Sequence, residues 1–281
     1  MRIPFTKMHG IGNDYVYVDA FRSPLDNPAE IARAVSPRRT GVGSDGLILI
    51  APSDRADCRM EMYNADGSRG EMCGNGIRCV GKYAFDHGIV GTETIRVETD
   101  AGIKDLALRV ENGRVSSVTV DMGPPDLEPA ALPMTADQPL IDTPVRIADQ
   151  DLQITAVSMG NPHCIVFVEE TDKAPVTSLG PRIERDPLFP RGVNVEFVEV
   201  LETAPSNRLR MRVWERGSGE TAACGTGACA VAVAAHLTSR GSRHVDVELL
   251  GGHLDIEWRE SDGHVYMTGP AAEVFTGEIE L

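Results

Sequence analysis

Residues 63–76 read Tyr-Asn-Ala-Asp-Gly-Ser-Arg-Gly-Glu-Met-Cys-Gly-Asn-Gly, and residues 214–227 read Trp-Glu-Arg-Gly-Ser-Gly-Glu-Thr-Ala-Ala-Cys-Gly-Thr-Gly. The two stretches align without a gap at an offset of 151 positions, the distance from Cys73 to Cys224. Each runs from an aromatic residue through a Gly-rich loop to Cys-Gly-x-Gly, and then into an apolar stretch with helical spacing. A duplicated cysteine at the start of a duplicated helix predicts two thiols that serve one site across a pseudo-two-fold axis.

The repeat extends beyond the cysteine loops. One Gly-Asn turn ends at Asn13 and another at Asn161, and each precedes a β-rich run. Gly41 and Gly192 lie in a further matching pair of segments, again 151 positions apart. Repetition at half the chain length indicates duplicated domains rather than a solenoid. We expect an N-terminal lobe of residues 1–122 plus 270–281 and a C-terminal lobe of residues 123–269, each with one cysteine motif.

Alternating apolar and polar residues predict strands in both halves. They are expected at residues 94–99, 103–110 and 115–122, and at residues 208–214, 245–250, 253–258 and 264–268. Helices are predicted after both cysteines, at residues 76–87 and 228–239, and a weaker surface helix at residues 28–35. The second of these is apolar on all sides, which is typical of a buried helix. Residues 123–144 contain six prolines and are expected to cross between the halves. The pattern predicts an α+β fold with two pseudo-symmetric lobes, each of mostly antiparallel strands around a central helix.

Composition excludes several classes of function. The net charge of −15 over 281 residues disfavours nucleic acid and anionic membranes as partners, but not a small anionic substrate held by backbone N–H groups. No run approaches the ~18–20 apolar residues of a transmembrane helix. The N-terminus lacks the apolar segment of a signal peptide, so we expect a cytoplasmic protein.

Cofactor motifs are also missing from the sequence. The six cysteines are too few for a disulfide scaffold, and their spacing fits zinc sites poorly. No phosphate loop, dinucleotide-binding glycine motif or suggestive lysine motif for pyridoxal phosphate is present. We therefore expect no metal and no organic cofactor.

The Cys-Gly-x-Gly motifs suggest acid/base chemistry. A helix N-terminus has unpaired N–H groups and a positive dipole end, so it can bind a carboxylate and lower the pKa of a nearby thiol. Two such thiols could take a proton from one face of a carbon and return one to the other. The remaining cysteines are expected to be small buried hydrophobes: Cys58, Cys79, Cys164 and Cys229.

Other polar residues have two interpretations each. Asn64 and Glu215 occupy matching positions, where they would bind substrate or, for Glu215, set a thiol pKa. The alternative is that Asn64 is an ordinary turn residue and Glu215 an ordinary surface residue. Arg216 is either a carboxylate clamp or half of a surface ion pair. His163 is either a partner of a thiol or a structural histidine.

In combination, these motifs resemble those of the diaminopimelate epimerase family, and the match spans essentially the whole chain. They lie at residues 7–14, 64–68, 72–79, 159–163, 215–221 and 223–227. The resemblance implies an isomerase free of pyridoxal phosphate that interconverts LL- and meso-2,6-diaminoheptanedioate in lysine and cell-wall precursor biosynthesis. It also implies a fold of two similar lobes with the site in the cleft.

The resemblance further implies roles for individual residues. Cys73 and Cys224 would be the acid/base thiols. Gly74, Asn75, Gly225 and Thr226 would cradle the reacting carboxylate. The rest of the substrate would be held by Asn13, Asn64, Asn161, Asn194, Glu215 and Arg216, and the thiols would be tuned by His163 and Glu215. Some members have Gln where this chain has Gly46, so any side-chain contact from that position is absent here.

Four alternatives differ in what they require of these residues. Proline racemases tend to carry His where this chain has Asn75, and a ring substrate gives no use for Glu215 and Arg216. Phenazine-type isomerases lack the paired cysteines. Proton exchange at a substrate α-carbon would exclude a non-catalytic amino-acid-binding protein. Activity that requires reduced thiols at both positions would disfavour a thiol redox sensor. The sequence leaves the oligomeric state open, including a homodimer.

Overall fold

The computed structural model describes residues 2–203 and 207–281. The chain divides into two compact units, one of Met1–Val120 with Thr268–Leu281 and one of Asp121–Met267. It passes from the first to the second within β8 (Arg114–Gly123) and returns within β17 (Val265–Gly269). Within the described residues, no helix is long and apolar enough to cross a membrane.

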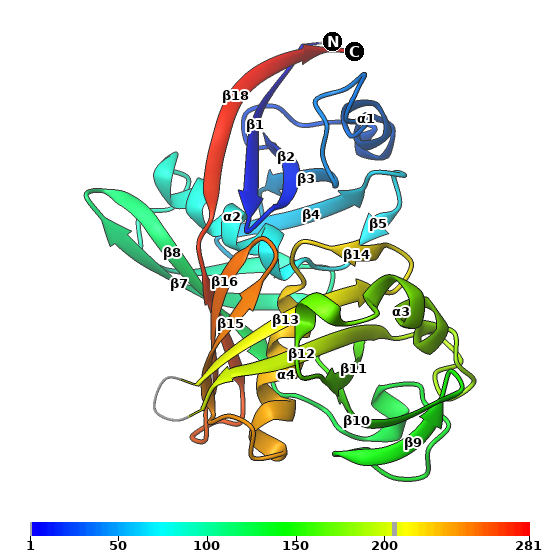
Figure 1. Ribbon diagram of the computed structural model, residues 1–281. Helices are drawn as coiled ribbons and strands as arrows, with labels where there is room; N and C mark the ends of the chain where they lie inside the picture. The colour runs from blue at the N-terminus through cyan, green and yellow to red at the C-terminus, as the bar shows by residue number, and fades with distance from the viewer. Residues whose placement is uncertain (1, 204–206) are drawn as a thin grey trace. The chain divides into compact units, whose positions relative to one another are not determined.

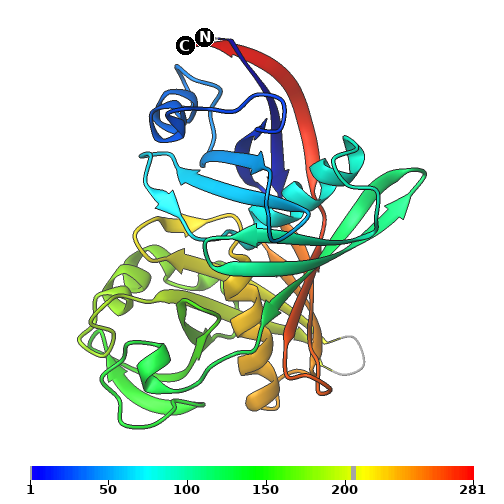
Figure 2. The same ribbon diagram turned by 180° about the vertical axis from the view of Figure 1, so that it is seen from behind.

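The first unit contains an antiparallel hairpin at its N-terminus. The second strand of this hairpin pairs in parallel with the next strand of the sheet. The strands of the unit are β1 (Arg2–Gly10), β2 (Asn13–Asp19), β3 (Gly46–Ala51), β4 (Cys58–Asn64), β5 (Arg69–Gly70), β6 (Thr94–Thr99), β7 (Gly102–Glu111) and β18 (Ala272–Glu280). The pairs β1–β2 and β3–β4 are antiparallel, whereas β2–β3 and β4–β6 are parallel. β18 pairs with β1, so both ends of the chain belong to this unit (Figure 1). β7 and β8 form a long antiparallel hairpin, drawn in blue-green in Figure 2.

Helix α2 (Gly74–Asp86) is the central helix of this unit. It packs against β1, β2, β3, β4, β6 and β7. Two of its glycines allow this close approach, because a Cβ on Gly76 would lie 2.7 Å from Ile48 and one on Gly81 2.8 Å from Leu106. Helix α1 (Pro28–Val35) is amphipathic and buries only one face, through Ile31, Ala32 and Val35.

The second unit repeats the same pairings. Its strands are β9 (Thr143–Ile147), β10 (Gln150–Ser158), β11 (Pro162–Phe167), β12 (Asn194–Glu202), β13 (Arg208–Glu215), β14 (Gly219–Thr221), β15 (His244–Leu249) and β16 (Gly252–Trp258). Here β10–β11 and β12–β13 are antiparallel, and β11–β12 and β13–β15 are parallel. Short 3-10 turns lie at Pro129–Ala131 and Thr171–Lys173.

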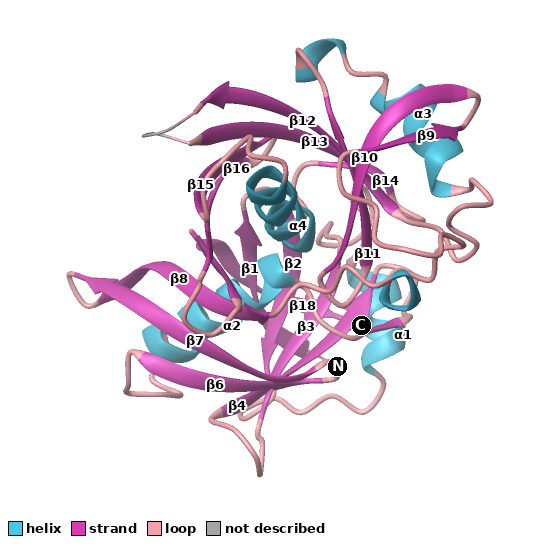
Figure 3. Cartoon of the chain, turned by 90° about the horizontal axis from the view of Figure 1, so that it is seen from below, coloured by secondary structure: helices cyan, strands magenta, loops and turns pink. Residues whose placement is uncertain are grey.

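Helix α4 (Gly225–Leu237) is the central helix of the second unit. It packs against β10, β11, β12, β15 and β16, and Figure 3 shows it among those strands. Its buried residues run from Ala228 to Ala235 without interruption, as expected for a helix that is apolar on all sides. Helix α3 (Val176–Glu184) covers β12 and β13.

The predicted fold class is confirmed: strands surround one central helix in each unit, and the sheet is mixed. The predicted strands and the surface helix at 28–35 are present, with ends that differ by no more than a residue or two. Both central helices begin earlier than predicted, at Gly74 and Gly225, because the preceding cysteine is the N-cap. Helix α3 was not predicted.

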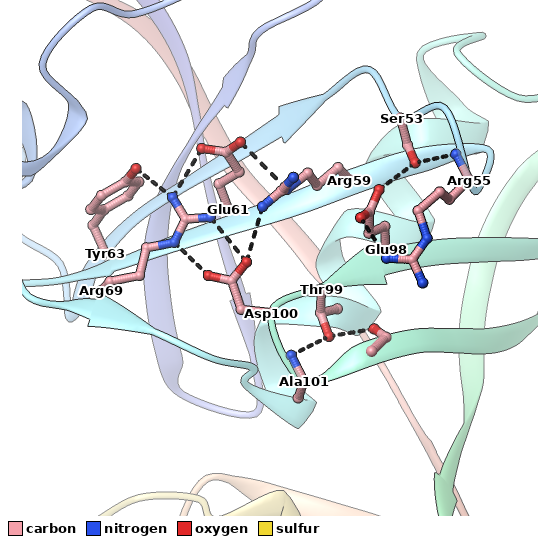
Figure 4. A network of polar contacts seen from close by, with 11 residues as sticks. Ser53, Arg55, Arg59, Glu61, Tyr63, Arg69, Glu98, Thr99, Asp100 and Ala101 are labelled. Atoms are coloured by element: carbon pink, nitrogen blue, oxygen red, sulfur yellow. Dashed lines mark hydrogen bonds and ion pairs between the residues drawn. The ribbon is translucent and has the colours of Figure 1, made fainter.

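An ion-pair network fixes the short strand β5 to its neighbours (Figure 4). Arg69 Nε lies 2.6 Å from Asp100 and its Nη1 lies 3.1 Å from Glu61, while Arg59 also contacts both carboxylates. A hydrogen bond from Arg69, joined by one from Arg59, holds the pKa of Asp100 below its ordinary value against the effect of burial. Because the Cys73 loop follows β5 directly, the network restrains the start of that loop.

Candidate active site

Cys73 lies at the positive end of α2. Its backbone is extended, and its Sγ accepts a hydrogen bond from the N–H of Gly76 at 3.3 Å. The next two residues, Gly74 and Asn75, are buried in the first turn. The thiol is therefore itself the helix cap, and the N–H groups of this turn are arranged as an anion-binding site requires.

Asn13 contacts the Cys73 thiol in a defined orientation. Its Nδ2 donates to Asp45 at 2.7 Å, which leaves Oδ1 to accept from Cys73 Sγ at 3.2 Å. Asp45 is in turn 2.8 Å from Arg38, which also contacts Asp14 at 2.7 Å. Although burial acts to raise it, hydrogen bonds from Arg38 and Lys7 hold the pKa of Asp14 below its ordinary value.

Tyr15 is a neighbour of Cys73 that the sequence reasoning missed. Burial raises the pKa of Tyr15 well above its ordinary value, and the nearby Cys73 and Asp45 raise it further. The phenol therefore stays protonated beside the thiol. Tyr15 follows Asn13 by two residues on β2, so strand alternation places both on one face.

Cys224 is the N-cap of α4 and is buried, with 5% of its surface exposed. Its Sγ lies 3.5 Å from Thr226 Oγ1, and Thr226 accepts from Asn161 Nδ2 at 3.3 Å. The second unit thus brings together Cys224, Gly225, Thr226 and Asn161, as the first brings together Cys73, Gly74, Asn75 and Asn13.

The expectation of a lowered thiol pKa is wrong for Cys224. Burial raises the pKa of Cys224 well above its ordinary value, and the negative charges of Glu215 and Glu196 raise it further; hydrogen bonds from Thr226 and the Gly227 N–H offset this only in part. Glu215 is itself affected, because burial raises its pKa despite hydrogen bonds with Thr221 and Cys224. Desolvation therefore outweighs the helix dipole here, and these surroundings favour the neutral thiol of Cys224.

His163 is fully buried and contacts two oxygen atoms. Its Nδ1 lies 2.7 Å from Glu196 Oε1, and its Nε2 lies 3.1 Å from Asn161 Oδ1. Glu196 is also fully buried and was missed by the sequence reasoning. The signal that would have found it is a carboxylate inside an otherwise apolar run, Val195-Glu196-Phe197-Val198.

The residues assigned to the far end of the substrate have different environments. Asn194 is buried and both ends of its amide bind backbone: Nδ2 donates to Pro162 O at 3.0 Å and Oδ1 accepts from Arg216 N at 2.9 Å. The side chain of Arg216 is exposed and donates to Arg191 O at 3.2 Å. Asn64 donates to Ser68 within its own turn. Asn194 thus fixes the backbone at Arg216, and both ends of its amide are engaged by backbone groups.

The other cysteines behave as the sequence predicts. Cys58, Cys79, Cys164 and Cys229 are all fully buried. Burial raises the pKa of Cys58 to about 12 and of Cys79 to about 11, so neither forms a thiolate at neutral pH. In the part of the chain that the structure describes, no group of three or more His, Cys, Asp or Glu side chains could hold a metal ion.

Gly46 is required by the close approach of β3 to β4. It pairs with Asn64, and a Cβ at this position would lie 2.1 Å from Tyr63 O and 3.1 Å from the Cα of Asn64. A larger residue there needs a shift of the backbone that carries Asn64. The end of β4 therefore runs closer to β3 than a side chain at this position allows.

We expect Gly46→Ala to lower the free energy of unfolding by about 1–3 kcal/mol, the usual cost of overpacking a tight site. Urea denaturation monitored by circular dichroism measures this. Gly91→Ala is the control, because a Cβ there meets nothing within 4 Å. Equal urea midpoints for Gly46→Ala and Gly91→Ala would show that β4 can shift without loss of stability. This result would contradict the prediction.

These observations define a class of protein: a duplicated α+β protein with a cysteine at the N-cap of the central helix in each unit. Solved structures share the fold. A phenazine biosynthesis protein of the PhzF family from Bacillus anthracis matches with a TM-score of 0.72 and 17% identity, over 100% of both chains. A probable proline racemase from Agrobacterium radiobacter matches with a TM-score of 0.68 and 16% identity, over 99% of this chain and 93% of that one. At these identities the likeness concerns the fold alone.

Sequence comparison narrows the class to one family. The family model for diaminopimelate epimerase matches residues 5–128 and 155–274. A diaminopimelate epimerase from Acetivibrio thermocellus is 55% identical over 278 residues, covering 99% of this chain and 98% of the relative. Another, from Methanococcus maripaludis, is 53% identical over 278 residues and covers 99% of both. The chain belongs to the diaminopimelate epimerase family.

Proposed function

We propose that this protein interconverts LL- and meso-2,6-diaminoheptanedioate with two thiols and no organic cofactor, as a step in lysine and cell-wall precursor biosynthesis. One observation carries the proposal: each unit presents a cysteine at the N-cap of its central helix, in a chain that is 55% identical to a diaminopimelate epimerase. We further propose that the two units are the two lobes of the enzyme and that both thiols act on one α-carbon.

The reaction requires one proton to leave and one to arrive. In this mechanism one thiolate removes the α-proton, and the other thiol donates its proton to the opposite face, so the net charge of the pair is unchanged. The carboxylate of the reacting centre is bound by the N–H groups of the two first turns, at Gly74, Asn75, Gly225 and Thr226. Charge that develops on that carboxylate in the transition state is stabilised by the same donors.

The surroundings of the second thiol, Cys224, determine its protonation. Burial and two nearby carboxylates disfavour the thiolate of Cys224, so we assign Cys224 as the proton donor. An ammonium group of the substrate would offset these carboxylates and allow Cys224 to act as a base in the reverse direction. Glu215 and His163 are the groups that we assign to this tuning.

The distal end of the substrate is assigned to Asn64, Asn194, Glu215 and Arg216. A linear dicarboxylic diamine has a second carboxylate for the Arg216 guanidinium, whereas a proline-like ring has none. For this reason we prefer diaminopimelate over a proline racemase activity. We propose that the enzyme acts in the cytoplasm, where its product would be used. We also propose that it assembles as a homodimer.

The test is exchange of the α-proton. Incubation with LL-diaminopimelate in D₂O should place one deuterium at one α-carbon and produce the meso isomer, as followed by NMR and chiral chromatography. Proline in the same buffer should acquire no deuterium. Exchange into proline at a comparable rate, or binding of diaminopimelate without exchange, would overturn the proposal in favour of a racemase of ring amino acids or a binding protein.

A further inference from the structure

Each unit has a carboxylate near its Gly-Asn turn. Asp45 immediately precedes β3, and Glu196 is the third residue of β12. The two positions are not equivalent in the strand register, because Leu47 and Val195 are the residues that pair with the matching Tyr63 and Trp214. β3 pairs in parallel with β2, and β12 pairs in parallel with β11. Each carboxylate therefore belongs to the strand next to the one that follows a Gly-Asn turn.

In the first unit the carboxylate contacts the amide directly. Asp45 Oδ2 accepts from Asn13 Nδ2 at 2.7 Å, and Asn13 Oδ1 accepts from Cys73 at 3.2 Å. Asp45 also accepts from the backbone N–H of Asp14 at 3.0 Å and from Arg38 at 2.8 Å. Because an anionic carboxylate can only accept, it binds the NH₂ group of Asn13 and leaves the carbonyl oxygen toward the thiol.

In the second unit a histidine stands between the carboxylate and the amide. Glu196 Oε1 lies 2.7 Å from His163 Nδ1, and His163 Nε2 lies 3.1 Å from Asn161 Oδ1. The contacts continue from Asn161 to Thr226 at 3.3 Å and from Thr226 to Cys224 at 3.5 Å. A continuous chain of hydrogen-bond contacts thus joins a fully buried carboxylate to the thiol.

Glu196 is a costly residue for a purely structural position. Its side chain is fully buried, and its Oε2 has no hydrogen-bond partner among the described residues. It also restricts its neighbour, because a Cβ on Gly227 would lie 2.8 Å from Glu196 Oε1 and 3.2 Å from Cys224 Sγ. Burial of an incompletely bonded carboxylate disfavours folding, so a role at the thiol explains the residue better than packing does.

We propose that Asp45 and Glu196 are positioning residues, each of which orients the Gly-Asn amide of its own unit toward that unit's cysteine motif and sets the protonation of the thiol by its charge. Asp45 acts through Asn13 on Cys73, and Glu196 acts through His163 and Asn161 on Cys224. The functional meaning of this assignment rests on the acid/base roles proposed for the two thiols, whereas the hydrogen-bond contacts are independent of those roles.

Other groups face the same thiols and belong in the interpretation of any titration. Cys224 faces Glu196 from β12 and Glu215 from β13, with His163 on β11 close to Glu215. Cys73 is close to Tyr15 and Tyr17 on β2, and to Cys79 on its own helix. Removal of one anion from either set should make the thiolate of that unit easier to form.

The experiment measures the alkylation of each thiol by iodoacetamide as a function of pH, by peptide mass spectrometry on the full-length protein. In Glu196→Gln we expect the midpoint for Cys224 to fall by about 0.5–1 pH unit, the effect of losing a nearby like charge, while Cys73 keeps its midpoint. In Asp45→Asn the midpoint for Cys73 should fall, while Cys224 keeps its midpoint. Glu196→Asp keeps the charge and should keep the midpoint, and so should Glu199→Gln, which lies on the same strand and binds Thr171 instead.

The outcomes separate this inference from the proposed function. A midpoint for Cys224 that stays or rises in Glu196→Gln, or an equal change at both thiols as in a loosened fold, overturns the assignment of Glu196. A Cys73 midpoint that is unmoved in Asp45→Asn overturns that of Asp45. Both readouts are independent of turnover, so a protein that lacked epimerase activity would still decide them. In the active protein, Glu196→Gln should lower kcat by about tenfold or more with little change in KM, as for a residue that acts on proton transfer.

Discussion

Cys73→Ala and Cys224→Ala should each lower the rate of epimerisation by more than about 100-fold, because an acid/base group contributes roughly 10²–10⁴-fold to such a rate. Each thiol is the N-cap of its own helix in its own unit, and the proposed mechanism uses one thiol on each face of the α-carbon. Neither can replace the other, since the remaining thiol would have to donate and accept on the same face. The rate is measured by conversion of LL-diaminopimelate to the meso isomer at saturating substrate.

The controls for this prediction are folding and a matched cysteine. Both variants should keep the circular dichroism spectrum of the native protein. Cys58→Ala removes a thiol that is fully buried and should keep activity, since Cys58 lies on β4 outside both helix starts. A single variant at Cys73 or Cys224 that retained more than about a hundredth of the native rate would rule out the two-thiol mechanism.

Arg216→Ala should lower kcat/KM for diaminopimelate by about tenfold to a hundredfold, as expected for a charged hydrogen bond worth ~1.5–3 kcal/mol. The backbone of Arg216 is held by Asn194, and its exposed guanidinium uses Nη1 to bind Arg191 O. The loop is supported from α3, because Glu184 accepts from Gly217 N at 3.0 Å and from Trp214 Nε1 at 2.7 Å. The guanidinium is thus carried on a fixed backbone, suited to a distal carboxylate.

Three measurements make this assignment specific. Arg146→Ala, which removes an exposed arginine paired with Asp151 on the β9–β10 hairpin, should leave kcat/KM unchanged. Arg216→Lys should recover only part of the loss, because a lysine lacks the planar fork. Exchange of a monocarboxylic analogue, however slow, should be almost the same in Arg216→Ala as in the native protein. Lysine epimerised by the native protein as well as diaminopimelate would show that the distal carboxylate is not read.

Repetition in the sequence was the strongest source of correct predictions. The 151-residue offset aligns the starts and the ends of α2 and α4, from Gly74 to Gly225 and from Asp86 to Leu237. Two carboxylates, Asp45 and Glu196, were missed because their partners, Asn13 and His163, are remote along the chain. The alternation of apolar and polar residues along the sequence does not reveal contacts between residues that are far apart in the chain.

Helix α3 shows where local patterns fail. Its sequence has a proline at position 181, in the last turn but one, and a glycine at 180, and both residues disfavour helices in isolation. The helix forms because Val176, Leu179 and Ile183 pack into the core of the second unit. A Cβ on Gly180 would lie 2.6 Å from Trp214, so the glycine is required by the tertiary contact.

The sequence by itself determined the α+β class, the duplication, the two central helices and the cysteines at their starts, because these depend on short-range periodicity and on a motif that occurs twice. Only the tertiary structure decided how Cys224 is protonated and which groups orient each thiol. Cys224 combines a helix N-terminus, which favours a thiolate, with burial and two carboxylates, which disfavour it, and the balance depends on Glu196 from β12 and Glu215 from β13. Desolvation and Coulomb interactions act over a few ångströms in space, so residues 9 and 28 positions away along the chain, Glu215 and Glu196, set the state of the cysteine.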